Sequence, residues 1–284
     1  MRLGFTNGQQ FKAKVRNLAK QKRIDPQILM QEVVLDEIVD RISHSQYRDH
    51  LILKGGFLIA SMIGVDTRAT RDIDTSIKGL PLTKDEVLKI FTEIADMNEP
   101  SSNVIIKITK IEDIRVAADY AGFRVHLEAK IFSSLVDTKI DVSTGDTITP
   151  REISWYHHTI FNNQEILVMA YNMETILAEK LESIVARQEL TTRMKDYYDL
   201  YLFDKVQRQN IDFKTLKNAL LATSQKRKTG ALLPSYKKII TRLRDSQVLK
   251  RRWEKYRMSY VYSKDVSYED TCTAALDLVR RSGI

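Results

Sequence analysis

The chain has 284 residues, a formal net charge of +8 and one cysteine, Cys272. This length allows one large domain or two modest ones, with enough residues for a sizeable core. One cysteine excludes an internal disulfide framework and a cysteine-rich zinc site, and no stretch approaches the ~18 uncharged apolar residues of a membrane span. We therefore expect a folded, basic protein of the reducing cytoplasm with no membrane partner.

The first part of the sequence alternates helix and strand signals. Apolar residues at helical spacing predict two helices between residues 8 and 46, the second capped by Asp25 with Pro26 in its first position. A short apolar strand, a Gly-Gly turn and a further helix follow. RDIDTSIKG, residues 71–79, alternates as a strand does, and a capping box at Thr83 begins an amphipathic helix.

Three β-like runs come next, and helical patterns follow them. The runs are NVIIKITKIEDI, FRVHLEAKIF and LVDTKIDVSTG. After Pro150 a short β-like segment, including ISWYHHTIF, gives way to helical patterns from about Met169 to the end. This order predicts an α+β fold in three parts: N-terminal helices over residues 1–46, an α/β core over 47–160 and a mostly helical domain over 161–284.

Positive charge is concentrated in one segment, residues 205–257. It holds sixteen Lys and Arg against three Asp and Glu, a local net charge of +13 that leaves −5 for the rest of the chain. Such a segment attracts polyanions such as nucleic acid, or it is the solvated face of a helical domain. Its aromatic residues Tyr236, Trp253 and Tyr256 would either stack on bases or belong to a helix core.

Two acidic residues share one face of the strand predicted at residues 71–79. Side chains alternate along a strand, so Asp72 and Asp74 point away from the face on which Ile73 packs. Asp141 alternates in the same way between two apolar neighbours on a later strand. If these strands pair, three carboxylates surround one site, where two Mg²⁺ ions would relieve their repulsion and support a phosphoryl displacement. A solvated strand face is the alternative for the Asp-x-Asp pair alone.

A Gly-Gly turn, Gly55-Gly56, precedes the Asp-x-Asp pair by sixteen residues. Glycines allow backbone N–H groups to approach a phosphate closely, and the N-terminus of the following helix favours anions. A tight strand-to-helix turn without a ligand would use the same two residues. Together with the carboxylates, the turn favours a nucleotide site.

These residues resemble a known family. Gly-Gly, a spacer, Asp-x-Asp on a strand and a later Asp on an apolar strand are similar to the DNA polymerase β-type nucleotidyltransferase fold. More narrowly, the sequence resembles the AbiEii/AbiGii toxins of type IV toxin–antitoxin (abortive-infection) systems over about residues 5–205. The segments that carry the resemblance are ILKGGFLIA, RDIDTSIKG, KIDVSTGDTITP, METILAEKLESIVAR and RMKDYYDLYLF. The broader superfamily has Gly-Ser where this chain has Gly-Gly, a departure that the narrower family tolerates.

The resemblance implies a nucleotidyltransferase-like mixed sheet with flanking helices, followed by a mostly helical C-terminal domain. It assigns catalytic roles to Asp72, Asp74, Asp141, Lys180 and Asp196, the first three as metal ligands. Lys180 borders an apolar helix stripe, from which it would either extend to solvent or point at a triphosphate. Asp199, one helical turn after Asp196, is interpreted as structural.

The nucleotide is expected to contact Lys54, Gly55, Gly56, Arg71 and Lys180. Arg71 and the nearby Arg68 flank the acids, and they would contact phosphates or form salt bridges to Asp66 or Asp72.

The function that these expectations define is a Mg²⁺-dependent nucleotidyltransferase toxin. It would transfer NMP from an NTP to an acceptor, with RNA such as the tRNA 3′ end as the leading candidate, and release pyrophosphate. The result would be growth arrest, neutralised by a cognate antitoxin encoded nearby. The alternatives are a non-catalytic module of the same fold that binds NTP or RNA, and a protein nucleotidylyltransferase.

Overall fold

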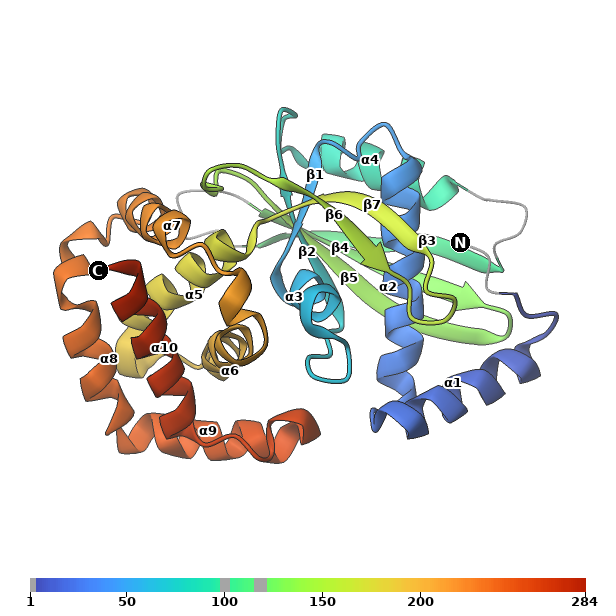
Figure 1. Ribbon diagram of the computed structural model, residues 1–284. Coiled ribbons are helices and arrows are strands. Elements are labelled where there is room, and N and C mark those ends of the chain that lie inside the picture. The colour runs from blue at the N-terminus through green and yellow to red at the C-terminus, as the bar shows by residue number, and fades with distance from the viewer. Residues whose placement is uncertain (1–3, 98–102, 115–121) are drawn as a thin grey trace. The chain divides into compact units, whose positions relative to one another are not determined.

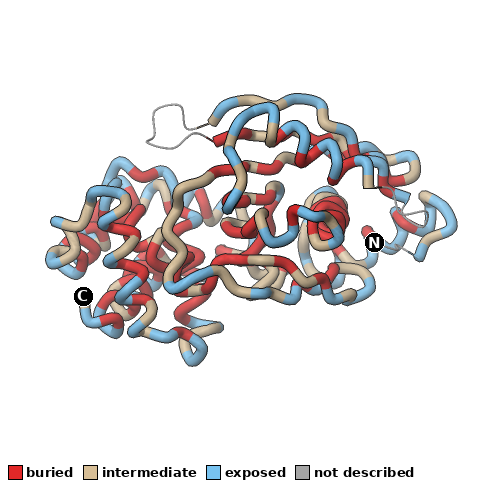
Figure 2. The backbone as a smooth tube through the Cα atoms, turned by 90° about the horizontal axis from the view of Figure 1, so that it is seen from above, coloured by how far each residue is buried: buried red, intermediate tan, exposed pale blue. Residues whose placement is uncertain are grey.

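The computed structural model describes residues 4–97, 103–114 and 122–284 (Figure 1). The chain forms two compact units, and each has its own buried core (Figure 2). Unit 1 comprises residues 1–145 and 153–170, and unit 2 comprises residues 146–152 and 171–284. None of the helices in the described ranges combines the length and the apolar character that a bilayer crossing requires.

Unit 1 is built on a mixed sheet, which confirms the predicted α+β class. In the described residues seven strands pair in the order β3-β4-β5-β2-β1-β7-β6. The pairs β2–β5 and β1–β7 are parallel, and the other pairs are antiparallel. The strands are β1 (Leu51–Lys54), β2 (Asp72–Ile77), β3 (Val104–Ile114), β4 (Gly122–Ile131), β5 (Ser134–Ser143), β6 (Ile153–His158) and β7 (Glu165–Ala170).

The α-helices described in unit 1 are α1 (Gly8–Lys22), α2 (Pro26–His44), α3 (Gly55–Ile63) and α4 (Lys84–Asp96). As predicted, Asp25 caps α2, where its side chain accepts a hydrogen bond from the backbone N–H of Gln27. Helix α2 packs against α4, β5 and β7. Its buried Arg41 donates to the carbonyl oxygens of Ala95 at 2.5 Å and Val104 at 2.7 Å. This guanidinium therefore ties the end of α4 to the start of β3.

Strand β7 differs from the sequence prediction, which included these residues in a mostly helical domain over 161–284. The segment EILVMA pairs antiparallel with β6 and parallel with β1, where Leu53 lies opposite Ala170. A short apolar run fits a buried strand as well as the start of a buried helix, so periodicity alone could not separate the two. Because β7 belongs to the sheet, unit 1 extends to residue 170 rather than to residue 160.

The regular elements of unit 2 in the described residues are helices. Its α-helices are α5 (Met173–Arg187), α6 (Met194–Leu202), α7 (Phe213–Lys226), α8 (Tyr236–Arg244), α9 (Gln247–Ser259) and α10 (Tyr268–Ser282). Tyr236, Trp253 and Tyr256 of the basic segment are buried, and the indole N–H of Trp253 donates to the carbonyl of Val266 at 3.0 Å. These aromatic residues therefore belong to the core, the second of the two alternatives for them.

Candidate active site

Strand β2 presents Asp72 and Asp74 on one face of the sheet. Ile73, Thr75 and Ile77 alternate with them and are at most 3% exposed. Asp72 and Asp74 are half-buried on the opposite face. The apolar positions hold the strand on the core, so both carboxylates are held away from it.

Strand β5 places Asp141 on the same face. It runs parallel to β2, with Asp141 opposite Asp74 and Lys139 opposite Asp72. The apolar neighbours of Asp141 are fully buried, and paired strands lie about 4.8 Å apart. The structure thus brings the three predicted carboxylates together on two adjacent strands of the sheet.

Gly55 and Gly56 bring the N-terminus of α3 against Asp74. Gly55 has a φ of +67°, in the left-handed region, and a Cβ atom there would lie 1.9 Å from Oδ2 of Asp74. The backbone N–H of Gly56 donates a hydrogen bond to the Asp74 carboxylate. The turn predicted to approach a phosphate therefore accommodates a carboxylate of the protein in this structure.

The surroundings of Asp74 disfavour its charged form. Burial raises its pKa, and repulsion from Asp72 and Asp141 raises it further, while Lys54 acts in the opposite direction. Lys54 lies opposite Asp74 on β1, is buried, and donates from Nζ to the Ser143 hydroxyl at 2.7 Å. A carboxylate whose pKa is raised gains from a further cation. The centre of the cluster is thus short of positive charge.

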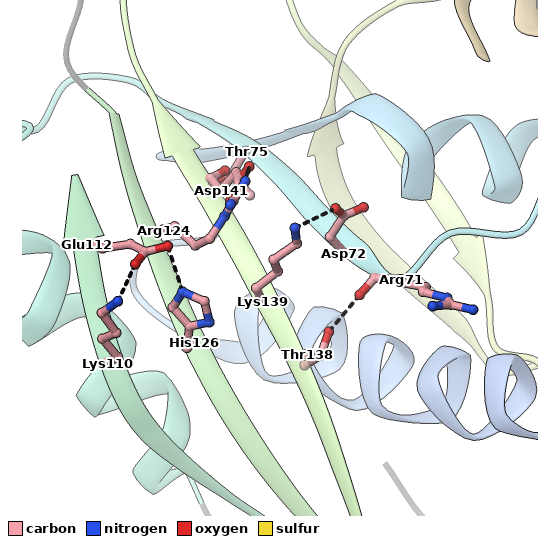
Figure 3. Close-up of polar contacts among 10 residues, drawn as sticks. All are labelled: Arg71, Asp72, Thr75, Lys110, Glu112, Arg124, His126, Thr138, Lys139 and Asp141. Carbon is pink, nitrogen blue, oxygen red and sulfur yellow. Dashed lines mark hydrogen bonds and ion pairs between the residues drawn. The ribbon is translucent and has the colours of Figure 1, made fainter. Parts of the chain in front are cut away.

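Two cations contact the outer carboxylates, as Figure 3 shows. Arg124 of β4 binds Asp141 through both oxygens, with Nε 2.7 Å from Oδ1 and Nη2 2.8 Å from Oδ2. Lys139 Nζ lies 3.6 Å from Oδ2 of Asp72. Sequence reasoning did not identify Arg124, because only the register of β4 on β5 places it opposite Asp141. Its position on the half-buried face of an alternating strand was the one local signal.

The charged residues of this face form a row across the sheet. Cα partners run in sequence from Lys54 on β1 through Asp74, Asp141 and Arg124 to Glu112 on β3. Glu112 accepts from Lys110 and, at 3.0 Å, from His126; these two hydrogen bonds lower its pKa to about 2. At the β3 end of the row, Glu112 therefore has positively charged or hydrogen-bonding partners. On β2 and β5, two acids, Asp74 and Asp141, lie side by side.

Arg71 stands apart from this cluster. Its side chain is exposed and forms no ion pair with any residue that the structure describes, and Figure 3 shows the guanidinium directed away from Asp72. The backbone oxygen of Arg71 accepts a hydrogen bond from the Thr138 hydroxyl at 3.0 Å. Arg68 is buried and donates to the carbonyl of Ala69 at 2.7 Å. The salt bridge considered between Arg71 and Asp72 is therefore absent from the described contacts.

The carboxylates fit a divalent cation in their donor chemistry. Oxygen ligands suit Mg²⁺, and the raised pKa of Asp74 is the observation that favours a cation among the three acids. In the parts of the chain that the structure describes, no three Asp, Glu, His or Cys side chains are already arranged as a metal ligand set. Arg124 and Lys139 contact the oxygens of the outer two carboxylates instead.

Unit 2 contains the two remaining catalytic candidates. Lys180 Nζ on α5 lies 2.9 Å from Oδ1 of Asp196 and 2.7 Å from Oδ2 of Asp199, both on α6. The Lys180 side chain is 12% exposed, so its ammonium is held by the carboxylates rather than extended into solvent. Burial favours the neutral form of Asp196, but Lys180 and Arg193 outweigh it and hold its pKa below the ordinary value. Asp199 contacts Lys180 as closely as Asp196 does.

The predicted catalytic residues thus form two groups. Unit 1 holds Asp72, Asp74 and Asp141, with Lys54, Gly55 and Gly56 beside Asp74. Unit 2 holds Lys180 and Asp196 as a direct ion pair.

A third polar cluster in unit 1 was not predicted. Ser61 on α3 lies 2.8 Å from Nδ1 of His157, whose Nε2 lies 2.8 Å from Oδ1 of Asp36. The two outer residues of this series also have hydrogen-bond donors of their own: the indole N–H of Trp155 donates to Ser61, and the backbone N–H of Ile160 donates to Asp36. The cluster therefore connects α2, α3 and β6 as a partly buried hydrogen-bond network.

Solved structures of other proteins share the fold of this chain. Two crystal structures from Helicobacter pylori share the fold. One, described as a candidate nucleotidyltransferase, has a TM-score of 0.55 and is 14% identical in sequence. The match covers 90% of this chain and 95% of that chain. The other, JHP933, has a TM-score of 0.54 and 13% identity over 90% and 91% of the respective chains. At these identities the likeness concerns the fold alone.

The family follows from a match over most of the chain. The family model for the nucleotidyl transferase AbiEii toxin of type IV toxin–antitoxin systems matches residues 37–275. The chain belongs to this family, and it is therefore a transferase by class. The match extends through the basic segment, beyond the residues on which the resemblance was first based. No curated protein matches the chain.

Proposed function

We propose that this nucleotidyltransferase depends on Mg²⁺ and transfers NMP from an NTP to RNA, with the tRNA 3′ end as the leading acceptor. The transfer would arrest growth until a cognate antitoxin neutralises the protein. The observation that carries the metal-dependent part is the placement of Asp74 opposite Asp141 on parallel strands, with Asp72 on the same face. Membership of a toxin–antitoxin family supports the antitoxin partner.

The proposed reaction is a displacement at the α-phosphorus. The oxygen of the acceptor hydroxyl bonds to this phosphorus and the hydroxyl proton is released. The bond from the phosphorus to the oxygen that bridges the α- and β-phosphates breaks, and its electron pair leaves with pyrophosphate. Asp72, Asp74 and Asp141 would hold the Mg²⁺, two ions in our proposal, which when bound would neutralise phosphate charge. Asp141 would also help to activate the acceptor hydroxyl. Lys180, held by Asp196, would stabilise charge on the departing pyrophosphate.

The nucleotide-binding residues are proposed around Asp74 and Asp72. Lys54, Gly55 and Gly56 surround Asp74 at the N-terminus of α3, where backbone N–H groups favour anions. Arg71 directly precedes Asp72 and has an exposed guanidinium. We propose it as a phosphate contact, since its charge is not committed to an ion pair with any described residue.

A polyanionic acceptor is supported by the basic segment of unit 2. Lys237 and Lys238 on α8 and Arg251 and Lys255 on α9 are exposed. None of the four forms an ion pair with any residue in the described part of the chain, so their charges are available to phosphates. This observation favours RNA over a protein acceptor.

The test incubates the purified full chain with Mg²⁺, total RNA and each α-labelled NTP in turn. We expect the wild-type protein to label RNA of tRNA size, and we expect this label to be lost in Asp74→Asn and Asp141→Asn. The control is Asp137→Asn, which removes an exposed acid from β5, the strand of Asp141, and should retain the label. Label in protein would identify the nucleotidylylation alternative, and NTP binding without transfer would identify the non-catalytic one. Either result would overturn the proposal.

Growth arrest is tested separately in cells. Asp72→Ala and Asp74→Ala are expected to fold, as judged by circular dichroism of the purified variants, and to abolish growth arrest on expression. Growth arrest at the wild-type level from either variant would count against the metal ligands proposed here.

A further inference from the structure

Arg124 occupies the oxygens that a metal ion at Asp141 would need. Its guanidinium forms two hydrogen bonds to Asp141, one to each carboxylate oxygen, at 2.7 and 2.8 Å. The two residues lie opposite each other on β4 and β5, and the pair is partly exposed, at 28% for Arg124 and 15% for Asp141. A guanidinium bound in this way and a divalent cation compete for the same acceptor atoms.

The other carboxylates near Arg124 already have partners. Glu112, the next residue in the row, accepts from Lys110 on one oxygen and from His126 on the other. Asp72 accepts from the Thr70 hydroxyl at 3.0 Å and has Lys139 at 3.6 Å. A guanidinium released from Asp141 would therefore face acids whose oxygens are already in contact with donors. It would remain next to the place where the proposed function puts the nucleotide phosphates.

We propose, building on the proposed function, that Arg124 is an exchangeable cation of this site. Without a divalent cation its guanidinium neutralises Asp141, and with one bound the guanidinium is displaced and pairs with a phosphate of the polyphosphate ligand. The planar fork that fits a carboxylate also fits a phosphate, so one residue serves both states. Arg124 thereby links metal loading to nucleotide binding.

A purely structural role for Arg124 predicts the opposite response of the metal site. If the ion pair served only to position Asp141, its removal would misplace a ligand and weaken metal binding. If Arg124 is exchangeable, its removal relieves a competitor and strengthens metal binding. The sign of the change therefore separates the two roles.

The experiment titrates Mn²⁺ into the nucleotide-free full chain by calorimetry. We expect Arg124→Gln to lower the Kd for Mn²⁺ about fivefold, because a partly exposed ion pair no longer competes. Lys130→Gln is the matched control: it removes one positive charge from the same strand, six residues and about 20 Å away, and should leave the Kd within about twofold. Arg124→Lys keeps the charge without the fork and should fall between wild type and Arg124→Gln.

A second titration measures inorganic tripolyphosphate at saturating Mn²⁺. Arg124→Gln should weaken this binding about tenfold through loss of a charge-assisted phosphate contact. Thermal unfolding of each variant verifies that it is folded.

The outcomes separate this inference from the proposed function. Tighter Mn²⁺ binding together with weaker tripolyphosphate binding supports the exchange. An unchanged or weaker Mn²⁺ affinity in Arg124→Gln overturns it, as does an unchanged affinity for tripolyphosphate. If wild type binds Mn²⁺ and Asp74→Asn does not, the proposed metal site stands even when the exchange fails. If no variant binds Mn²⁺, both the metal site and the exchange are wrong.

Discussion

The two groups of candidate residues handle negative charge in opposite ways. In unit 1, burial and repulsion from its neighbours raise the pKa of Asp74. In unit 2, Asp196 is buried, yet Lys180 and Arg193 overcome the effect of burial and lower its pKa. The group in unit 2 is a neutralised ion pair network, whereas the group in unit 1 has carboxylates that still gain from a cation.

This difference indicates which group is completed by a ligand. Lys180 already satisfies two buried carboxylates, so that network is complete without any added ion. Asp74 and Asp141 lie opposite each other, and the cations beside them, Lys54 and Arg124, belong to the flanking strands. A divalent cation would therefore stabilise unit 1 more than unit 2. The two tryptophans report the units separately, Trp155 on β6 and Trp253 on α9.

The largest expected effect breaks the network of unit 2. Lys180→Met should lower the free energy of unfolding by about 4 kcal/mol, because it leaves Asp196 and Asp199 buried without their shared cation. Urea denaturation in a Trp155→Phe background, followed by Trp253 fluorescence, measures the loss. Lys237→Met, at an exposed position of the same unit, should change stability by less than about 0.5 kcal/mol. Equal effects of the two variants would refute the assigned network.

A second prediction uses pH to expose uncompensated acid in unit 1. Burial, with repulsion from Asp36, raises the pKa of Glu32 from 4.5 to about 8. A raised carboxyl pKa contributes stability below the unfolded value of 4.5 that is lost as pH rises through about 8. Glu32→Gln should therefore abolish most of the fall in the free energy of unfolding that this group causes as pH rises from 4.5 to about 8. Denaturation followed by Trp155 fluorescence in a Trp253→Phe background is the measurement, and an unchanged pH dependence in the variant would contradict it.

The smallest effects sharpen the comparison by their opposite signs. At neutral pH Asp74→Asn should raise the free energy of unfolding by about 1 kcal/mol, since it removes a buried charge that its neighbours repel. Asp196→Asn should lower it by about 2 kcal/mol, since it removes a partner of Lys180. Because its pKa is lowered, the contribution of Asp196 is present above its ordinary value of 3.8 and is lost as pH falls below it. If Asp74→Asn and Asp196→Asn change the free energy of unfolding in the same direction, the two groups do not handle negative charge differently.

Local patterns were enough to predict the orientation of the acids. Alternation along β2 and β5 places Asp72, Asp74 and Asp141 on the face away from the core, because the period of a strand is set by its own backbone. Helical spacing likewise placed Asp196 and Asp199 one turn apart. At this spacing Lys180 contacts both carboxylates. It was not predicted from the sequence that Asp196 and Asp199 would both contact Lys180.

Pairing between distant segments could not be predicted in the same way. The parallel register of β2 on β5 and the antiparallel register of β4 on β5 depend on the whole sheet, so nothing near Arg124 in sequence shows that it faces Asp141. Strand β7 was missed for a related reason, since its pairing with β1 is what distinguishes it from a helix. The role of Gly55 in admitting the Asp74 carboxylate also required the folded backbone.

The central claim is that Asp72, Asp74 and Asp141 together hold divalent cations for nucleotidyl transfer. The most direct measurement is anomalous diffraction from crystals soaked with Mn²⁺ and a non-hydrolysable NTP analogue. We predict Mn²⁺ peaks in contact with Asp74 and Asp141, with the guanidinium of Arg124 on a phosphate. Clear density for the bound analogue with every Mn²⁺ peak remote from these three carboxylates would contradict the account.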